Sequence, residues 1–142
     1  MKSISMKSMS IQFNLKNIVM LMLFLHHTSA FCGWKEVASD QVATEFVNVE
    51  TAQRFGIFVQ MWSMSDYKVP QEVGNGRLYK SSKTLQEYDC EHHKKRYFNM
   101  IHYVENMGLG QVAFLDRTLG AWREVKVGSL GDAQLSLACK QP

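Results

Sequence analysis

Two cysteines in the second half of the chain constrain its fold more than any other feature. Cys90 ends a strand-like run over residues 77–90, and Cys139 lies in a short helical pattern over residues 129–140. Disulfides persist in exported proteins, and the start of this chain has the pattern of an export signal. We therefore expect a Cys90–Cys139 bond that ties a C-terminal helix to a sheet. The alternative is two unrelated buried thiols.

The first 30 residues have the parts of a secretory signal peptide. Three lysines and no acidic residue accompany an apolar run over residues 18–25, and small residues end at Ala30, the expected cleavage site. These eight apolar residues are too few to span a bilayer, which takes roughly 20 in a helix. The alternative for this run is a buried core helix. Because the segment before it is long, Met6 and Met9 are alternative start residues.

Removal of residues 1–30 changes the charge of the protein. The full chain has 16 Lys and Arg residues against 13 Asp and Glu residues, and three of the lysines leave with the signal, so residues 31–142 are formally neutral. A neutral domain lacks the positive field that nucleic-acid binding uses, which argues against a nucleic-acid partner. We interpret the one basic cluster, residues 94–96, as a solvated hairpin turn. The remaining length is that of one domain without a further membrane-spanning stretch.

Strand patterns dominate the mature chain, and one helix follows them. Strand-like segments cover residues 34–37, 45–49, 57–67, 77–90, 96–104 and 111–115, and residues 122–127 are a candidate for an additional edge strand. We expect a turn of helix over residues 50–54 and the end of the third strand at Pro70. Aromatic and branched residues on both faces of 57–67 predict a strand covered on both sides. Ser129 and Asp132 have the spacing of a helix N-cap.

The sequence contains none of the common catalytic motifs. It has no GxSxG, HExxH, phosphate loop or dinucleotide fingerprint. A cysteine nucleophile would need a thiol that the expected disulfide removes. Residues 89–93 and His102 are of metal-ligand type, but the adjacent His92 and His93 point to opposite faces of an extended segment. We expect no enzyme, no metal and no cofactor.

Aromatic side chains are the best candidates for a binding surface. Trp62, Tyr79 and Tyr97 would contribute to it if they belong to an exposed patch larger than a monomer normally leaves open. The alternative is that the large aromatic residues pack in the core or at its edge. Cys32 is left over after the expected disulfide, and it is free, linked to another chain or lipidated.

Several segments resemble the bacterial surface-adhesin protein E-like domain, over nearly the whole mature chain. The matching positions are residues 34–37, 61–62, 66–68, 70–71, 82–90, 96–97, 107–110, 122, 127–129 and 137–139. The most specific parts are the Glu-Tyr-Asp-Cys run that ends at Cys90 and the Ala-Cys pair that ends at Cys139.

The resemblance implies an α+β fold, in which an antiparallel sheet of about six strands is tied to a C-terminal helix by the Cys90–Cys139 disulfide. It also implies export in a Gram-negative bacterium, to the periplasm or the outer cell surface. The family is named for a surface adhesin that binds extracellular-matrix proteins such as vitronectin and laminin, so these are the implied partners. We expect residues 31–142 to be a non-enzymatic binding domain. The alternative is a periplasmic or envelope-associated structural domain without a host ligand.

Overall fold

The alternating segments of the sequence form six main strands, followed by a short seventh strand and a helix. The computed structural model describes residues 33–142; the predicted signal peptide, its cleavage site at Ala30, the two alternative start residues and Cys32 lie outside the described residues. The elements are β1 (Trp34–Ser39), β2 (Ala43–Phe55), β3 (Phe58–Val73), β4 (Arg77–Asp89), β5 (Lys94–Tyr103), the 3-10 helix η2 (Asn106–Gly108), β6 (Val112–Asp116), β7 (Arg123–Glu124) and α2 (Leu130–Ala138). In this part of the chain, no helix is long and apolar enough to cross a membrane.

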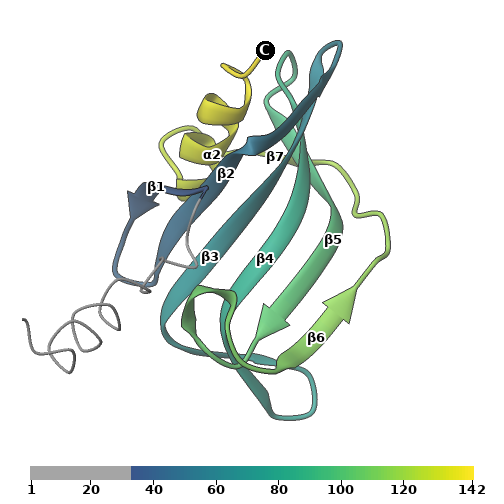
Figure 1. Ribbon diagram of the computed structural model, residues 1–142. Coiled ribbons are helices and arrows are strands. Elements are labelled where there is room, and N and C mark those ends of the chain that lie inside the picture. Colours follow the sequence, from purple (N-terminus) through teal and green to yellow (C-terminus); the bar gives the residue numbers. More distant parts are fainter. Residues whose placement is uncertain (1–32) are drawn as a thin grey trace, which may run out of the picture. The chain divides into compact units, whose positions relative to one another are not determined.

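The main strands form one antiparallel sheet whose order follows the chain from β1 to β6 (Figure 1). Strand β5 pairs with β4 along one edge and with two strands along its other edge. β6 pairs with its second half, and β7 pairs with Lys94 and Lys95 in its first half. The chain between β6 and β7 stays close to this edge, because the Gly120 N–H donates to the Tyr97 carbonyl at 2.9 Å. The predicted antiparallel sheet is therefore confirmed, with a short seventh strand at its edge.

Helix α2 packs on one face of the sheet, which we call the helix face; the other is the outer face. The helix lies against β1, β2 and β3. The Ser129 hydroxyl accepts a hydrogen bond from the Asp132 N–H at 3.2 Å, which is the predicted N-cap. Leu135 and Ala138 face inward. The buried core consists of Val47, Val59, Met61, Tyr88, Val125, Leu135 and Ala138.

A disulfide joins the helix to the sheet, as predicted. It links Cys90, which follows β4, to Cys139, the C-cap of α2, and their Cα atoms are 5.7 Å apart. Arg54 on β2 adds a second attachment at this end, because its guanidinium donates to the Cys139 carbonyl at 2.7 Å. The C-terminal end of α2 is therefore tied to two different strands.

Two predicted strand boundaries are wrong, and irregular strand pairing explains both. Residues 50–54 are not a turn of helix but part of β2, and the pairing of β2 with β3 shifts register between Asn48 and Gln53. Pro70 does not end β3, which continues to Val73. The pairing of β3 with β4 is interrupted between Asp66 and Gln71, so Pro70 lies where no ladder hydrogen bond is required of it.

The basic cluster is also placed differently from its prediction as a turn. Lys94, Lys95 and Arg96 begin strand β5, and the turn consists of the residues before them. Successive side chains of a strand point to opposite faces. Lys95 therefore points to the helix face and its two neighbours to the outer face, which separates the three charges.

Strand β3 is covered unequally on its two faces. Val59 and Met61 are fully buried on the helix face, whereas Gln60 and Trp62 on the outer face are half-buried. Met64, also on the outer face, is buried. The predicted cover on both faces is therefore found on the helix face from Val59 to Ser63 and only locally on the outer face.

Candidate functional site

Polar side chains form a buried network between α2 and the helix face of the sheet. Gln134 of α2 donates from Nε2 to Glu45 Oε2 at 2.7 Å, and the Ser65 hydroxyl donates to the same oxygen at 2.8 Å. Gln86 Nε2 donates to Ser63 Oγ at 2.8 Å and lies 3.4 Å from Gln134 Oε1. Burial disfavours the charged carboxylate and raises the pKa of Glu45. Local sequence patterns did not predict this network, although a glutamate at an inward position of an apolar strand is a signal for it.

We expect Glu45→Gln to raise the free energy of unfolding near neutral pH. Because the pKa of Glu45 is raised in the folded protein, stability falls as pH rises from 4.5 through the folded pKa. Desolvation outweighs the attraction of nearby Lys95 among the causes. Glutamine keeps an oxygen that accepts from Ser65 and Gln134, but it has no charge to desolvate.

Urea unfolding of both proteins between about pH 4 and pH 8 measures this effect. The advantage of the variant should be smallest at the acidic end and grow with pH. Glu50→Gln is the matched control, since it makes the same change at an exposed carboxylate of the same strand. An advantage of Glu45→Gln that does not change with pH would contradict the assignment.

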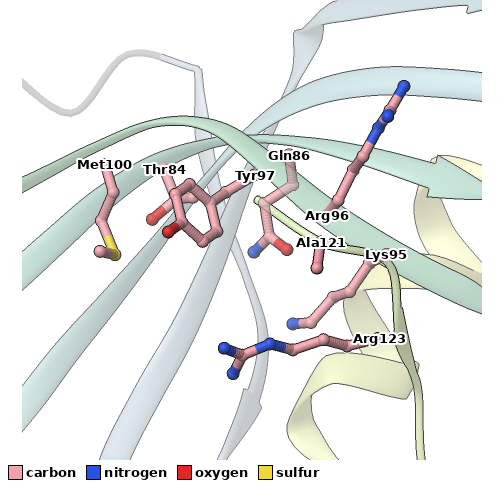
Figure 2. A pocket seen from close by; sticks show the side chains of 8 residues that line it. All are labelled: Thr84, Gln86, Lys95, Arg96, Tyr97, Met100, Ala121 and Arg123. Atoms are coloured by element: carbon pink, nitrogen blue, oxygen red, sulfur yellow. The ribbon is translucent and has the colours of Figure 1, made fainter. Parts of the chain in front are cut away.

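A pocket of about 300 Å³ opens on the helix face beside this network (Figure 2). Its lining comes from β4, β5 and the segment that leads into β7, and consists of Thr84, Gln86, Lys95, Arg96, Tyr97, Met100, Ala121 and Arg123. Gln86 belongs to both the network and the pocket. The lining contains three cationic residues and no carboxylate.

The Arg96 guanidinium leaves the pocket for the outer face. Figure 2 shows its side chain pointing away from those of Lys95 and Arg123. Its Nε donates to Glu87 Oε2 at 2.6 Å, and its guanidinium carbon lies 4.4 Å from the ring centroid of Trp122. Arg96 is therefore neutralised and stacked on an aromatic ring, and only Lys95 and Arg123 direct charge into the pocket.

The three aromatic residues predicted for a binding surface lie at separate places. Tyr97 lines the pocket on the helix face, and its hydroxyl donates to Asp116 at 3.2 Å. Trp62 lies on the outer face, beside a hollow that it lines with residues of β2, β3 and β4. Tyr79 stacks on His102 with ring centroids 4.0 Å apart. All three are half-buried and they do not form one patch, so a binding role for any of them stays a prediction.

Tyr79 belongs to an aromatic cluster on the part of the helix face that lies toward β6. His102 stacks between Tyr79 and Phe114, and Tyr67 meets the edge of Tyr79. The ring of His102 is hydrogen-bonded to Ser82 at 3.0 Å, and burial lowers the pKa of His102. Burial raises the pKa of Tyr67 to about 12. His102 is therefore packed between aromatic rings, and burial favours the neutral form of its imidazole.

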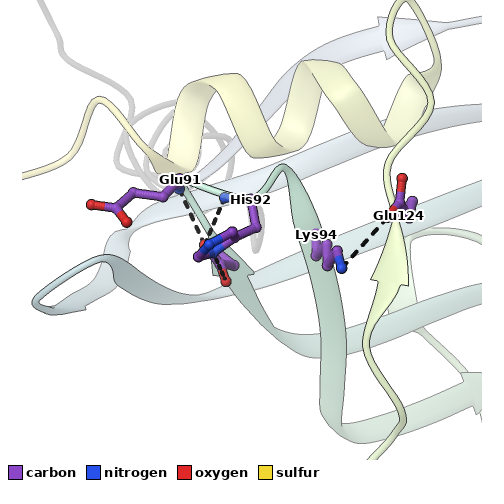
Figure 3. A network of polar contacts seen from close by, with 5 residues as sticks. Glu91, His92, Lys94 and Glu124 are labelled. Atoms are coloured by element: carbon purple, nitrogen blue, oxygen red, sulfur yellow. Dashed lines mark hydrogen bonds and ion pairs between the residues drawn. The ribbon is translucent and has the colours of Figure 1, made fainter.

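The turn between β4 and β5 uses its acidic and histidine residues for structure (Figure 3). Asp89 accepts hydrogen bonds from the N–H groups of Glu91 and His92 and from the ring of His92. Lys94 pairs with Glu124 across the β5–β7 ladder at 3.5 Å. Within residues 33–142, no three His, Cys, Asp or Glu side chains are arranged to hold a metal ion.

A comparison with the sequence models of protein families identifies the family of this chain. The sequence model of the family named surface-adhesin protein E matches residues 34–140. The chain belongs to this family. The predicted membership is therefore confirmed over nearly all of the described residues.

Two solved structures of protein E from Haemophilus influenzae have the same fold. The structure of Haemophilus influenzae protein E matches with a TM-score of 0.57 and 10% identity, over 76% of this chain and 84% of that one. A crystal structure of protein E from non-typeable Haemophilus influenzae matches with a TM-score of 0.52 and 12% identity, over 80% of this chain and 76% of that one. At such identities the likeness shows the fold alone. No curated protein matches the chain.

Membership of the surface-adhesin protein E family points to a binding protein of the exported or surface type. Family membership assigns no contact residue in this chain. Two hollows are candidates on structural grounds: the basic pocket on the helix face and the hollow at Trp62 on the outer face.

Proposed function

We propose that this protein is an exported, non-enzymatic binding domain that attaches to extracellular-matrix proteins, with vitronectin and laminin as the first candidates. The observation that carries the proposal is the family match over residues 34–140. The disulfide supports export, because such bonds persist in oxidising compartments. The signal-peptide pattern before residue 31 supports it as well.

The outer face is the favoured contact surface for a protein partner. Helix α2 covers part of the helix face, whereas Trp62 on the outer face is half-buried at the rim of a hollow that it shares with Gln60 and Leu85. Aromatic side chains at such positions dominate the free energy of many protein interfaces. We therefore assign the central contact to Trp62 rather than to Tyr79, which packs against His102.

Binding of the purified exported protein to immobilised vitronectin, laminin and an unrelated protein tests the proposal. We expect saturable binding to at least one matrix protein and none to the control. Because the mature chain is formally neutral, the affinity should change little with salt concentration. Trp62→Ala should weaken binding by about tenfold or more, whereas Tyr79→Ala should leave it near the wild-type value. Absence of binding to both matrix proteins would remove adhesion to them as the function.

Surface labelling of intact cells separates the adhesin from a periplasmic structural domain. An adhesin must be labelled by a reagent that does not cross the outer membrane. A protein that is labelled only after the cells are opened faces the periplasm, and matrix binding would then not be its role.

A further inference from the structure

Two like charges lie directly opposite each other on the helix face. Lys95 of β5 and Arg123 of β7 are register partners in an antiparallel pair, so their side chains leave the sheet on the same side. Figure 2 shows both side chains running alongside each other into the pocket. Like charges directly opposite each other destabilise a sheet unless another group compensates them.

The neighbouring cations of β5 are compensated, whereas this pair is not. Lys94 pairs with Glu124 at 3.5 Å, and the Arg96 side chain donates to Glu87. Among the described residues, neither the Lys95 ammonium nor the Arg123 guanidinium has a hydrogen-bond or ion-pair partner. The sequence thus supplies partners on the outer face and leaves a pair of cations unmatched on the helix face.

Acidic groups around the pocket are already engaged. Glu45 attracts Lys95, but its Oε2 accepts from Gln134 and Ser65. Asp116 lies beyond the Tyr97 ring and accepts from the hydroxyls of Tyr97 and Thr118. Burial lowers the pKa of Lys95, and the attraction of Glu45 offsets this effect only in part.

The rest of the pocket is suited to a small group that is part polar and part apolar. The Gln86 amide and the Thr84 hydroxyl are polar groups on its floor, while Tyr97, Met100 and Ala121 supply apolar lining. The volume of about 300 Å³ is at the lower end of the range for ligand pockets. An arginine and a lysine that converge on one space match the two oxygens of a carboxylate.

We propose that the pocket between Lys95 and Arg123 binds a carboxylate carried on a short apolar group. The C-terminus of a peptide that ends in an apolar residue has this chemistry, and so does a free aromatic or aliphatic acid. The carboxylate lies between the ammonium and the guanidinium, and its apolar group contacts Tyr97 and Met100. This inference is independent of matrix binding, because it rests on the pocket alone.

Titration of the full chain, produced in an exporting host and purified, tests the pocket directly. The probes are 3-phenylpropionate, its uncharged amide and inorganic phosphate. Binding is monitored by NMR through the backbone N–H resonances of the protein. We expect 3-phenylpropionate to shift the resonances of Gln86 and Tyr97 and to bind at least about tenfold more tightly than its amide. Equal binding of acid and amide, or no shifts at about 10 mM acid, would overturn the proposal. Tighter binding of phosphate than of the acid would overturn the assignment to a carboxylate.

A pair of peptides distinguishes the two sources of the carboxylate. One peptide ends in Phe with a free carboxylate, and the other has the same sequence with a C-terminal amide. Binding of the free-acid peptide more tightly than 3-phenylpropionate assigns the pocket to chain ends. Binding of 3-phenylpropionate without binding of the peptide assigns it to free organic acids.

Substitutions at the two cations locate the site. Arg123→Gln should weaken binding of the acid by about tenfold or more, and Lys126→Gln is the matched control, because it removes the same charge from an exposed residue outside the pocket. Lys95→Met is the second variant, with its melting temperature compared with that of the wild type. Unchanged binding in both Arg123→Gln and Lys95→Met would place the acid elsewhere. Matrix binding measured on Arg123→Gln should remain, which keeps the two proposals separable.

Discussion

Replacement of both Cys90 and Cys139 by alanine should lower the free energy of unfolding by about 4 kcal/mol. The two cysteines are 49 residues apart. A disulfide that closes a loop of this size lowers the chain entropy of the unfolded state and so raises its free energy by about 4 kcal/mol. Typical domains have a total stability of about 5–15 kcal/mol. The variant is therefore expected to be close to unfolding at 37 °C. Urea unfolding followed by circular dichroism measures the change.

Reduction of the wild-type protein is the control for this experiment. A reducing agent should lower the unfolding midpoint of the wild type to about that of the double variant and leave the double variant unchanged. If the wild type unfolds at the same urea concentration with and without reductant, the bond does not stabilise the exported protein.

Leu135→Ala should lower the free energy of unfolding by about 2–5 kcal/mol, the usual cost of truncating a buried leucine. Leu135 is 4% exposed and is the largest apolar side chain that α2 buries against the sheet. Its truncation leaves a cavity in the core cluster that also contains Val47, Met61 and Tyr88, whose backbone positions are fixed by the sheet. Thermal and urea unfolding of the variant measure the loss.

Leu78→Ala provides the matched control, because it makes the same chemical change at a leucine of β4 that is 55% exposed. Its effect should stay within about 0.5 kcal/mol. Similar losses in the two variants would mean that the packing of α2 on the helix face does not contribute to stability as described.

The parts of the fold that were predictable from sequence depend on local patterns. The N-cap at Ser129 follows from residue types that are close together in the chain, and the strand segments follow from alternation. The extension of β2 through residues 50–54 and the passage of β3 through Pro70 were not predictable in this way. Both depend on register shifts, and a register shift is a relation between two strands that a local pattern does not contain.

The same limit applies to the candidate site. Residues 94–96 were predicted as a turn because a short run of basic residues is typical of a solvated connection. The partners of Lys94 and Arg96 come from neighbouring strands, and the local pattern does not contain that pairing. The pocket requires β7 to pair with β5 rather than to extend β6, so that Arg123 meets Lys95. Trp62, Tyr79 and Tyr97 were selected by residue type, and strand pairing then distributed them over both faces of the sheet.

The buried Glu45–Gln134 hydrogen bond has a consequence for the freedom of α2. A helix held only by a covalent bond at one end can still swivel about that point, and apolar packing tolerates small rotations. Gln134 lies one turn before the end of the helix, and rotation of the helix about its axis would carry its amide away from Glu45. The bond at Cys139 sets where the helix sits, and the hydrogen bond sets which side of it faces the sheet. Together they oppose both displacement and rotation of α2.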